Sequence, residues 1–283
     1  MKLIKPSFKI WNQPAGLEGV YKQIEKVGRV CYKSEDKMTE DSAKPFVERM
    51  TKSGHGAMLE HGTVYLHIKG IDRTDITKYL YNKYSKVVEG SLDHFYVTTN
   101  YRVLIENGWL DDLQYICEPT EFHAKRITVH FVCDRGVSHE FVRHRVMSFA
   151  QESTRYCNYS KDKFGNEITF IKPCFLDDSK LALYGPYHTV IRDKSPESIF
   201  IASLNNAEKD YIDLIDLGWK PQEARAVLPN ALKTELVMTG FVSDWNHFFD
   251  LRARGTTGAP HPQAKELAEP LMKEFIARKY INN

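Results

Sequence analysis

Helix-like and strand-like hydrophobic patterns are interspersed along this chain, and that mixture constrains the fold more than any other feature. The clearest strand pattern is KRITVHFVCD, and LKTELVM alternates in the same way further on. The longest helix pattern opens at Ser195 and Pro196 and closes at Gly218. Strands and helices do not follow one another in a regular β–α–β series. The sequence therefore predicts a mixed α+β fold.

Shorter patterns complete this interpretation, and those between residues 70 and 124 are the hardest to read. The remaining predicted elements are, in chain order, a strand at 7–11, a helix at 17–31, a short helix around 46–50, a strand at 64–68, a helix near 74–88, a strand at 94–100 followed by a helix, a short helix at 137–145, a helix that starts at Pro221 and stops at Pro229, a capped helix at 243–252, and a C-terminal helix interrupted by Pro270.

Composition excludes several functional classes. The 283 residues, 42% hydrophobic and 27% charged, can bury a proper core as one large domain or two small ones. A formal net charge of +2 provides no overall field for nucleic acid, so any anion site must be local. The five cysteines include no C-x-x-C pair, which favours reduced thiols over a disulfide framework or a zinc ribbon. No signal-peptide core or run of transmembrane length is present. We therefore expect a cytoplasmic protein that binds neither nucleic acid nor membrane.

The segment RHRVMSFAQESTRY, residues 143–156, combines three arginines, a histidine and two hydroxyls with apolar residues that favour burial. Guanidinium groups bind phosphate, carboxylate or planar imide edges through paired, charge-assisted hydrogen bonds. Two more arginines, Arg225 in QEARAVLP and Arg252 in WNHFFDLR, lie in similarly apolar surroundings. These arginines predict an anion site. For any single arginine, an equally weighted alternative is a structural ion pair with Glu140, Glu152, Glu223 or Asp250.

Other chemistries fit the spacing poorly. A zinc-binding helix needs two histidines at i and i+4, but His144 follows His139 at i+5. The sequence contains no G-x-S-x-G nucleophile turn and no phosphate-binding glycine pattern. We therefore expect no metal site and no serine hydrolase. Arginine chemistry is what the motif favours.

The arginine-rich segment resembles the signature of flavin-dependent thymidylate synthases, in which Arg-His-Arg is followed after seven residues by Ser. Arg143, His144, Arg145 and Ser153 have that spacing. Four other stretches resemble further elements of the family in the same order, and Arg225 and Arg252 are 27 residues apart, as in the family pattern. These stretches are SGHGAMLEH, EARAVLP, FFDLR and HPQAKEL.

The resemblance implies an enzyme that transfers the methylene group of 5,10-methylenetetrahydrofolate to dUMP and reduces it with FADH2, which NADPH regenerates, to give dTMP. It implies a central sheet with flanking helices, a single domain over 1–283, and a homotetramer whose active sites are shared between subunits. The rival hypotheses are another flavoprotein or nucleotide-binding protein and, more remotely, a nucleic-acid-binding module.

Site residues follow from the resemblance position by position. Arg252 is expected to be catalytic, by stabilising the anion formed when uracil N3 loses its proton. The expected dUMP contacts are Glu140, Arg143, Gln151, Glu152, Ser153, Thr154, Arg155, Arg225 and Arg252. The expected FAD contacts are His55, Glu60, Arg143, His144, Arg145, Gln151, His247 and His261.

The chain departs from the family pattern at several positions. Gln151 replaces a glutamate, and His247 replaces an asparagine. Members usually carry Asn-x-Arg where this chain has Phe241 and Ser243. Asn100 and Arg102 in TTNYR could supply the missing pair, or they could form an ordinary turn. The segment around 70–124 is longer than in compact members.

Overall fold

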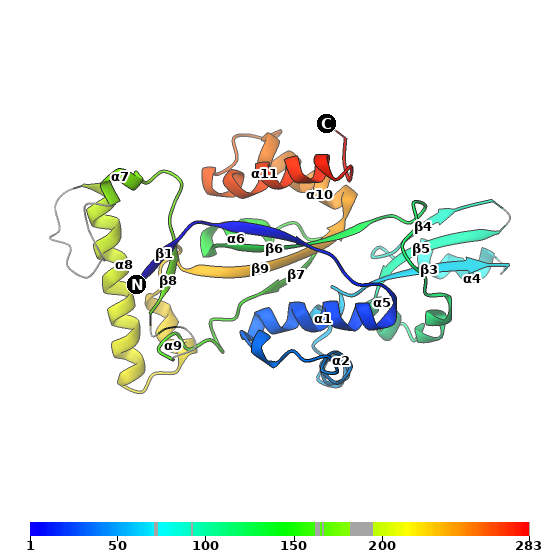
Figure 1. The fold of residues 1–283 in the computed structure, drawn as a ribbon, viewed down its shortest axis with the longest axis horizontal. Helices are drawn as coiled ribbons and strands as arrows, with labels where there is room; N and C mark the ends of the chain where they lie inside the picture. Colours follow the sequence, from blue (N-terminus) through cyan, green and yellow to red (C-terminus); the bar gives the residue numbers. More distant parts are fainter. Residues whose placement is uncertain (71–72, 92, 162–164, 166, 182–194, 283) are drawn as a thin grey trace.

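The computed structural model describes residues 1–70, 73–91, 93–161, 165, 167–181 and 195–282. Its centre is a four-stranded antiparallel sheet with strand order β2-β6-β9-β7 (Figure 1). The strands are β2 (Ser7–Trp11), β6 (Arg126–Asp134), β9 (Lys233–Phe241) and β7 (Ser148–Gln151). The two long strands, β6 and β9, pair along their whole length, from Arg126 opposite Phe241 to Asp134 opposite Lys233.

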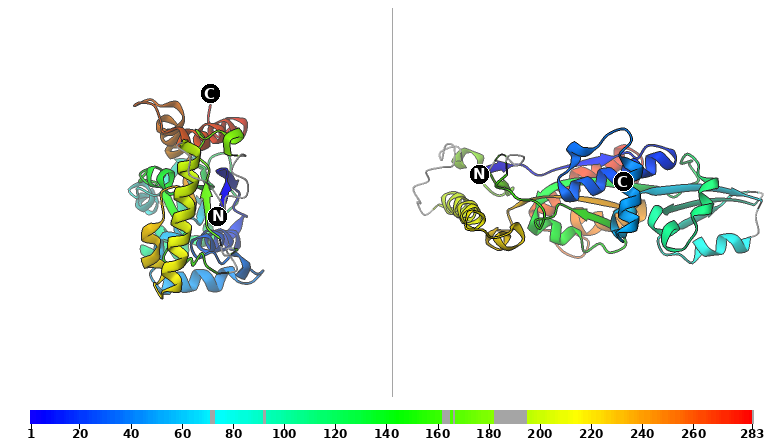
Figure 2. Two further views of the ribbon diagram at one scale, coloured as in Figure 1. Left: turned by 90° about the vertical axis from the view of Figure 1, so that its left-hand side faces the viewer. Right: turned by 90° about the horizontal axis from the view of Figure 1, so that it is seen from below.

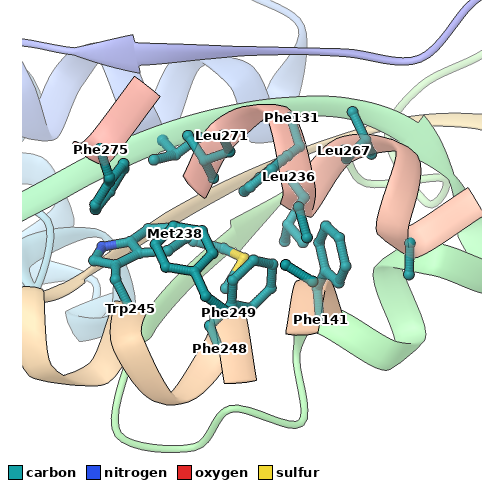
Figure 3. Close-up of a cluster of buried hydrophobic side chains, with 14 of the residues drawn as sticks. Phe131, Phe141, Leu236, Met238, Trp245, Phe248, Phe249, Leu267, Leu271 and Phe275 are labelled. Carbon is teal, nitrogen blue, oxygen red and sulfur yellow. The ribbon is translucent and has the colours of Figure 1, made fainter. Parts of the chain in front are cut away.

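One face of this sheet carries the aromatic core. It is covered by α6 (Arg135–Phe141), α10 (Val242–Phe249) and α11 (Pro262–Ala277). Alternate strand residues such as Phe131, Leu236 and Met238 meet Trp245, Phe248, Phe249 and Phe275 from the helices (Figure 3). The Trp245 indole N–H donates to the Ile127 carbonyl at 3.1 Å, so this large ring is buried with its polar atom satisfied. Burial of these rings fixes α10 on the sheet.

The other face is covered by α1 (Gly16–Tyr32), with α2 (Ala43–Lys52) packed on α1 and the short α3 (Gly56–Leu59) between them and β7. Figure 1 shows α1 and α2 below the sheet and α10 and α11 above it. Polar pairs lie inside this face: His61 and Thr239 are joined at 2.8 Å, as are Thr128 and Thr239. The central layer is therefore apolar on one side and partly polar on the other.

A second antiparallel sheet extends from one end of the molecule, and its strand order is β3-β5-β4. It consists of β3 (Thr63–Lys69), β5 (His94–Asn100) and β4 (Lys86–Glu89), with α4 (Arg73–Leu80), α5 (Tyr101–Glu106) and η2 (Leu110–Tyr115) beside it. The segment expected to be an insertion, 70–124, supplies β4 and β5. The apolar core beside this second sheet includes Leu66, Tyr79 and Val97.

The opposite end contains a parallel pair of short strands, β1 (Lys2–Ile4) and β8 (Thr169–Ile171), and the long helix α8 (Pro196–Asp216). The right-hand view in Figure 2 shows α8 at the end of the elongated molecule that lies farthest from the second sheet. The remaining elements are η1 (Glu35–Lys37), α7 (Asp178–Leu181), α9 (Pro221–Ala224), η5 (Arg225–Val227) and the π-helix η6 (Asp250–Arg254).

The mixed α+β fold with helices flanking a central sheet is confirmed, and three predicted elements need correction. The helix expected near 74–88 ends at Leu80, and 86–89 is strand β4, because Val87 and Val88 pair with Val97 and Tyr96. A turn held by the Asn82 side chain, which accepts from the Tyr84 N–H at 2.9 Å, separates the two.

The helix expected at 137–145 is α6, which starts at Arg135 and ends at Phe141. Asp134 caps its start by accepting from the Val137 N–H at 2.8 Å. The Arg-His-Arg run thus lies beyond the helix. The final helix contains Pro270 without a break in its assigned span.

Candidate active site

Arg252 lies in the π-helix that continues α10, a form of helix often found at functional sites. Its guanidinium donates to the Glu140 carboxylate at 2.5 Å, to the Glu140 carbonyl at 3.0 Å and to His144 Nε2 at 3.3 Å. A cavity of about 510 Å³ opens beside it. The lining residues are Glu140, Arg143, His144, His247, Leu251, Arg252, Thr257, Gly258, Ala259, Pro260 and His261. The structure thus gathers six expected site residues in one cavity.

His144 is the buried member of this cavity. Burial lowers its pKa to about 4, and the positive charge of Arg252 and the neighbouring His247 act in the same direction. Its Nε2 accepts a hydrogen bond from Arg252, which only a neutral imidazole can do. His144 therefore serves as a hydrogen-bond acceptor and an aromatic wall, with its ring 5.0 Å from that of Phe248.

Helix α6 connects this cavity with a second group of expected residues, which belong to the segment 151–155. Glu140 faces Arg252, and two residues earlier Ser138 accepts a hydrogen bond from the Gln151 side-chain amide at 2.9 Å. The same amide nitrogen lies 3.2 Å from Thr234 Oγ1 on β9. Gln151 is therefore held between α6 and β9, where an amide can donate to hydroxyls and a glutamate could not.

Glu152 belongs to a buried charge network rather than to an open surface. Lys233 Nζ lies 2.8 Å from Glu152 and 2.6 Å from Glu235, and Glu235 also contacts Lys33 and His130. Burial alone would raise the pKa of Glu235, but the hydrogen bond from His130 and the charges of Lys233 and Lys33 hold it well below its usual range. The network attaches the segment 152–155 to both β9 and the end of α1.

The remaining residues of the segment form a turn beside α9. The Ser153 N–H donates to the Cys31 carbonyl at 3.0 Å, and Ser153 Oγ accepts from the Arg155 N–H at 3.3 Å. Arg225 Nη1 donates to Thr154 Oγ1 at 2.9 Å. Arg155 is exposed and lies against the Tyr156 ring. The arginine of EARAVLP is thus brought to the arginine-rich segment across 71 residues of sequence.

His55 and Glu60 form a third group, on the opposite face of the sheet from Arg252. Glu60 accepts from Arg102 at 2.6 Å, and Arg102 also donates to Glu106 at 2.7 Å. A cavity of about 120 Å³ is lined by Glu60, Tyr84, Asn100, Arg102, Val103 and Glu106. Asn100 is the N-cap of α5, since it accepts from the Val103 N–H at 3.1 Å. Asn100 thus has a helix-capping role, whereas Arg102 is paired with an expected flavin-contacting residue.

Two residues in these surroundings were missed by sequence reasoning. Lys233 neutralises Glu152, and Arg135 has a buried guanidinium nitrogen without a hydrogen-bond partner in the part of the chain that the structure describes. Strand periodicity gave no signal for Lys233. Arg135 lies at the start of α6, eight residues before the recognised motif, and a survey of every arginine near the motif would have found it.

The cysteines are poor candidates for a nucleophile. Burial raises the pKa of Cys31 to about 11 and that of Cys133 further. Within the described residues, no three histidine, cysteine or acidic side chains are placed to hold a metal ion. No helix in the same part of the chain is long and apolar enough to cross a membrane.

Fold and site define an α+β protein with a polar cavity lined by arginine and histidine and a separate hydroxyl-rich anchoring turn. The sequence profile described as "Thymidylate synthase complementing protein" matches residues 17–85 and 114–278. The chain therefore belongs to this family. Residues 86–113 lie between the two matched stretches, within the segment expected to be an insertion.

Curated relatives carry the name flavin-dependent thymidylate synthase. The protein from Corynebacterium aurimucosum is 24% identical over 93% of this chain and 78% of its own length. The protein from Pyrococcus furiosus is 31% identical over 53% of each chain. The protein from Geobacter sulfurreducens is 29% identical over 42% of this chain and 43% of its own. A solved UMP/dUMP methylase, PolB from Streptomyces cacaoi, gives a TM-score of 0.44 at 17% identity, covering 98% of this chain and 93% of that one.

Proposed function

We propose that this protein is a flavin-dependent thymidylate synthase, which converts dUMP into dTMP with 5,10-methylenetetrahydrofolate as the carbon donor and NADPH as the reductant. The observation that carries the proposal is the cavity where Arg252, His144 and Glu140 meet. The cavity combines two arginines with a neutral histidine and with exposed backbone groups. This set of polar groups suits a planar imide and its neighbouring phosphates.

Arg252 is the proposed catalytic residue because it presents a fixed positive charge at the cavity wall. Its ion pair with Glu140 orients the guanidinium plane, and its positive charge adds to the burial that keeps the His144 ring neutral. A pyrimidine with N3 against this guanidinium would lose its N3 proton more readily, because the resulting anion is stabilised electrostatically. No covalent bond to the protein is needed, in keeping with the raised pKa of the buried thiols.

We propose that the segment 151–155 and Arg225 bind dUMP. Thr154 and Arg225 are already joined, so they can approach a phosphate together, and the exposed guanidinium of Arg155 adds a second fork. Glu152 is buried at 2% exposure and fully engaged by Lys233 and Tyr159, so its proposed part is to hold the backbone of this segment.

FAD, when bound, would supply the hydride. The chain's donors fit such a cofactor: Arg143, His144, His247 and His261 line one cavity, Glu60 lines the smaller one, and His55 lies at the other end of the short helix α3 from Glu60. Because these groups lie on opposite faces of the sheet, one chain does not bring them together. We therefore propose that the whole chain is one unit and that a complete site combines residues from several copies, in a homotetramer.

Purified protein should contain or bind FAD, and in the absence of oxygen its reduced flavin should be oxidised only when dUMP and methylenetetrahydrofolate are both present. Labelled dTMP is the product to detect. Flavin binding without dUMP-dependent oxidation would favour a different flavoprotein, and absence of flavin binding would exclude both. Sedimentation with and without FAD would test the tetramer.

A further inference from the structure

A further cavity lies between the end of α1, helix α2 and the turn at Tyr156. Its volume is about 540 Å³, within the usual range of small-molecule pockets. Three aromatic side chains, Tyr32, Phe46 and Tyr156, contribute to its lining, together with four cations. Among the described residues, Asp36 is the one carboxylate that lines it. The cavity thus combines flat apolar walls with an excess of positive charge.

Two of the four cations are already bound to carboxylates. Arg29 donates to Glu25 at 2.8 Å, and Lys33 forms an ion pair with Glu235. These two cations are held on α1 and at its end, so their contacts with the protein leave them less able to bind an additional anion.

The other two cations, Lys37 and Arg49, are exposed and form no ion pair within the part of the chain that the structure describes. Water solvates an exposed cation, so the lack of a counter-ion alone does not indicate a ligand. The setting does: Arg49 Cζ is 5.2 Å from the centre of the Phe46 ring, at the rim of a cavity with aromatic walls. A ligand with a flat ring and negative charge would match both features.

The cavity adjoins the segment proposed to bind dUMP. Tyr156 directly follows Arg155, and its ring lies 5.4 Å from that of Tyr32. The Ser153 N–H donates to the Cys31 carbonyl at 3.0 Å, so the segment is held to the end of α1. A ligand in this cavity would therefore lie beside a nucleotide on the segment 151–155.

The proposed function indicates which ligand this is. Methylenetetrahydrofolate has to lie close to dUMP, because its carbon is transferred to the uracil ring. NADPH reduces the flavin and need not touch the nucleotide. The folate also matches the cavity chemically: its p-aminobenzoyl ring is flat, and its glutamate tail carries carboxylates, which a guanidinium binds at two points.

We propose that this cavity binds the p-aminobenzoyl-glutamate tail of the folate, with Arg49 and Lys37 binding its carboxylates. The inference rests on the proposed function and makes its substrate more specific. Because each further γ-linked glutamate adds a carboxylate, the preferred carbon donors are folates with several glutamates. Asp36, which lines the same cavity, opposes the binding of the tail.

The first test measures binding apart from turnover. Full-length, FAD-loaded protein is titrated with pteroyltriglutamate, an oxidised folate that has no carbon to transfer. Arg49→Gln and Lys37→Gln should each weaken binding about tenfold, the scale of one charge-assisted hydrogen bond, and reduce its dependence on salt. Asp36→Asn should bind more tightly. Lys44→Gln, an equal charge change at an exposed position of α2 outside the cavity lining, is the matched control and should bind as the wild type does.

The second test uses turnover. The wild type should have a lower KM for the triglutamate form of methylenetetrahydrofolate than for the monoglutamate form. Arg49→Gln should remove most of this difference, because the contact with the added carboxylates is lost, while the KM for NADPH stays the same.

The outcomes separate this inference from the proposed function. If the wild type forms no dTMP from dUMP with either folate, the proposed function fails and this inference fails with it. If it forms dTMP but Arg49→Gln and Lys37→Gln bind pteroyltriglutamate as tightly as it does, the inference alone is overturned. The same holds if the KM for NADPH rises instead, or if Lys44→Gln weakens binding equally. Should Arg49→Gln fail to fold, Lys37→Gln and Asp36→Asn decide.

Discussion

The ammonium of Lys233 lies 2.8 Å from the carboxylate of Glu152, and it joins β9 to the segment proposed to hold dUMP. Lys233 also contacts Glu235 at 2.6 Å, but Glu235 has Lys33 and His130 as further partners, so Glu152 depends on this cation more than Glu235 does. The position of the nucleotide segment thus depends on a strand residue that does not itself belong to the segment.

Lys233→Met should leave the buried Glu152 carboxylate without its cation, next to a Glu235 that keeps Lys33 and His130. Breaking a buried ion pair on one side typically costs about 3–5 kcal/mol, so we expect a loss of that order in the free energy of unfolding. Urea unfolding would measure it. Lys233→Met with Glu152→Gln should recover part of the loss, because the double variant no longer contains the carboxylate that the single variant leaves without a cation. Unchanged stability in the single variant would show that the network is not buried as described.

His144→Gln should flatten the dependence of stability on acid. The folded-state pKa of His144 is about 4, below the value near 6.5 of an unfolded chain, so the unfolded state binds more protons between these values. The stability that the neutral His144 contributes is therefore fully present above about pH 6.5 and falls as the pH drops toward 4. Thermal melts across this window would measure the slope.

His61, whose pKa burial lowers to about 3, acts in the same direction. The slope in His144→Gln should therefore shrink rather than vanish. His139→Gln, at an exposed position on α6, is the control and should leave the slope as it is in the wild type.

Arg252→Ala should retain FAD and its reduction by NADPH but lose turnover by about 100-fold or more, the usual effect of removing one preorganised electrostatic contact. Stopped-flow oxidation of reduced flavin by dUMP and methylenetetrahydrofolate would detect it. Arg254→Ala removes a neighbouring guanidinium whose partner is the half-exposed Asp250, and it should turn over normally. If Arg252 serves only as the ion-pair partner of Glu140, its loss will lower the melting temperature while folded protein keeps near-normal turnover.

Arg155→Lys should weaken dUMP binding and spare FAD. Lysine keeps the charge of this exposed side chain but loses the planar fork that contacts phosphate at two points. Equilibrium binding of dUMP to the FAD-loaded protein is the measurement. Wild-type affinity in the lysine variant would remove Arg155 from the phosphate site, and Arg225→Lys would then be the next variant to examine.

Local patterns were informative where one periodicity dominated. The strands around Val129 and Leu236 and the aromatic helix around Phe248 follow from apolar spacing, and the family signature pointed to Arg143, His144 and Arg252, which the structure gathers at one cavity. Where a helix pattern and a short strand pattern adjoined, the strand was missed. Val87 and Val88 were assigned to a helix because their pairing partners on β5 lie about ten residues away and leave no local trace.

Long-range charge pairing was invisible for a similar reason. Glu152 and Lys233 are 81 residues apart, and nothing in either neighbourhood indicates the other. The contact between Lys86 and Ser243 spans 157 residues. Such contacts depend on sheet order, which sequence periodicity does not determine.

Strand β9 limits how this chain can change over evolutionary time. Lys233, Glu235, Thr239 and Phe241 alternate along one side of it, while Leu236 and Met238 face the aromatic core. Because side chains change sides at every residue, a single-residue insertion in mid-strand would turn one half of this row into the core. Insertions should therefore survive in lineages only outside this strand, as in the segment that carries β4, where length can vary without disturbing which side each residue faces.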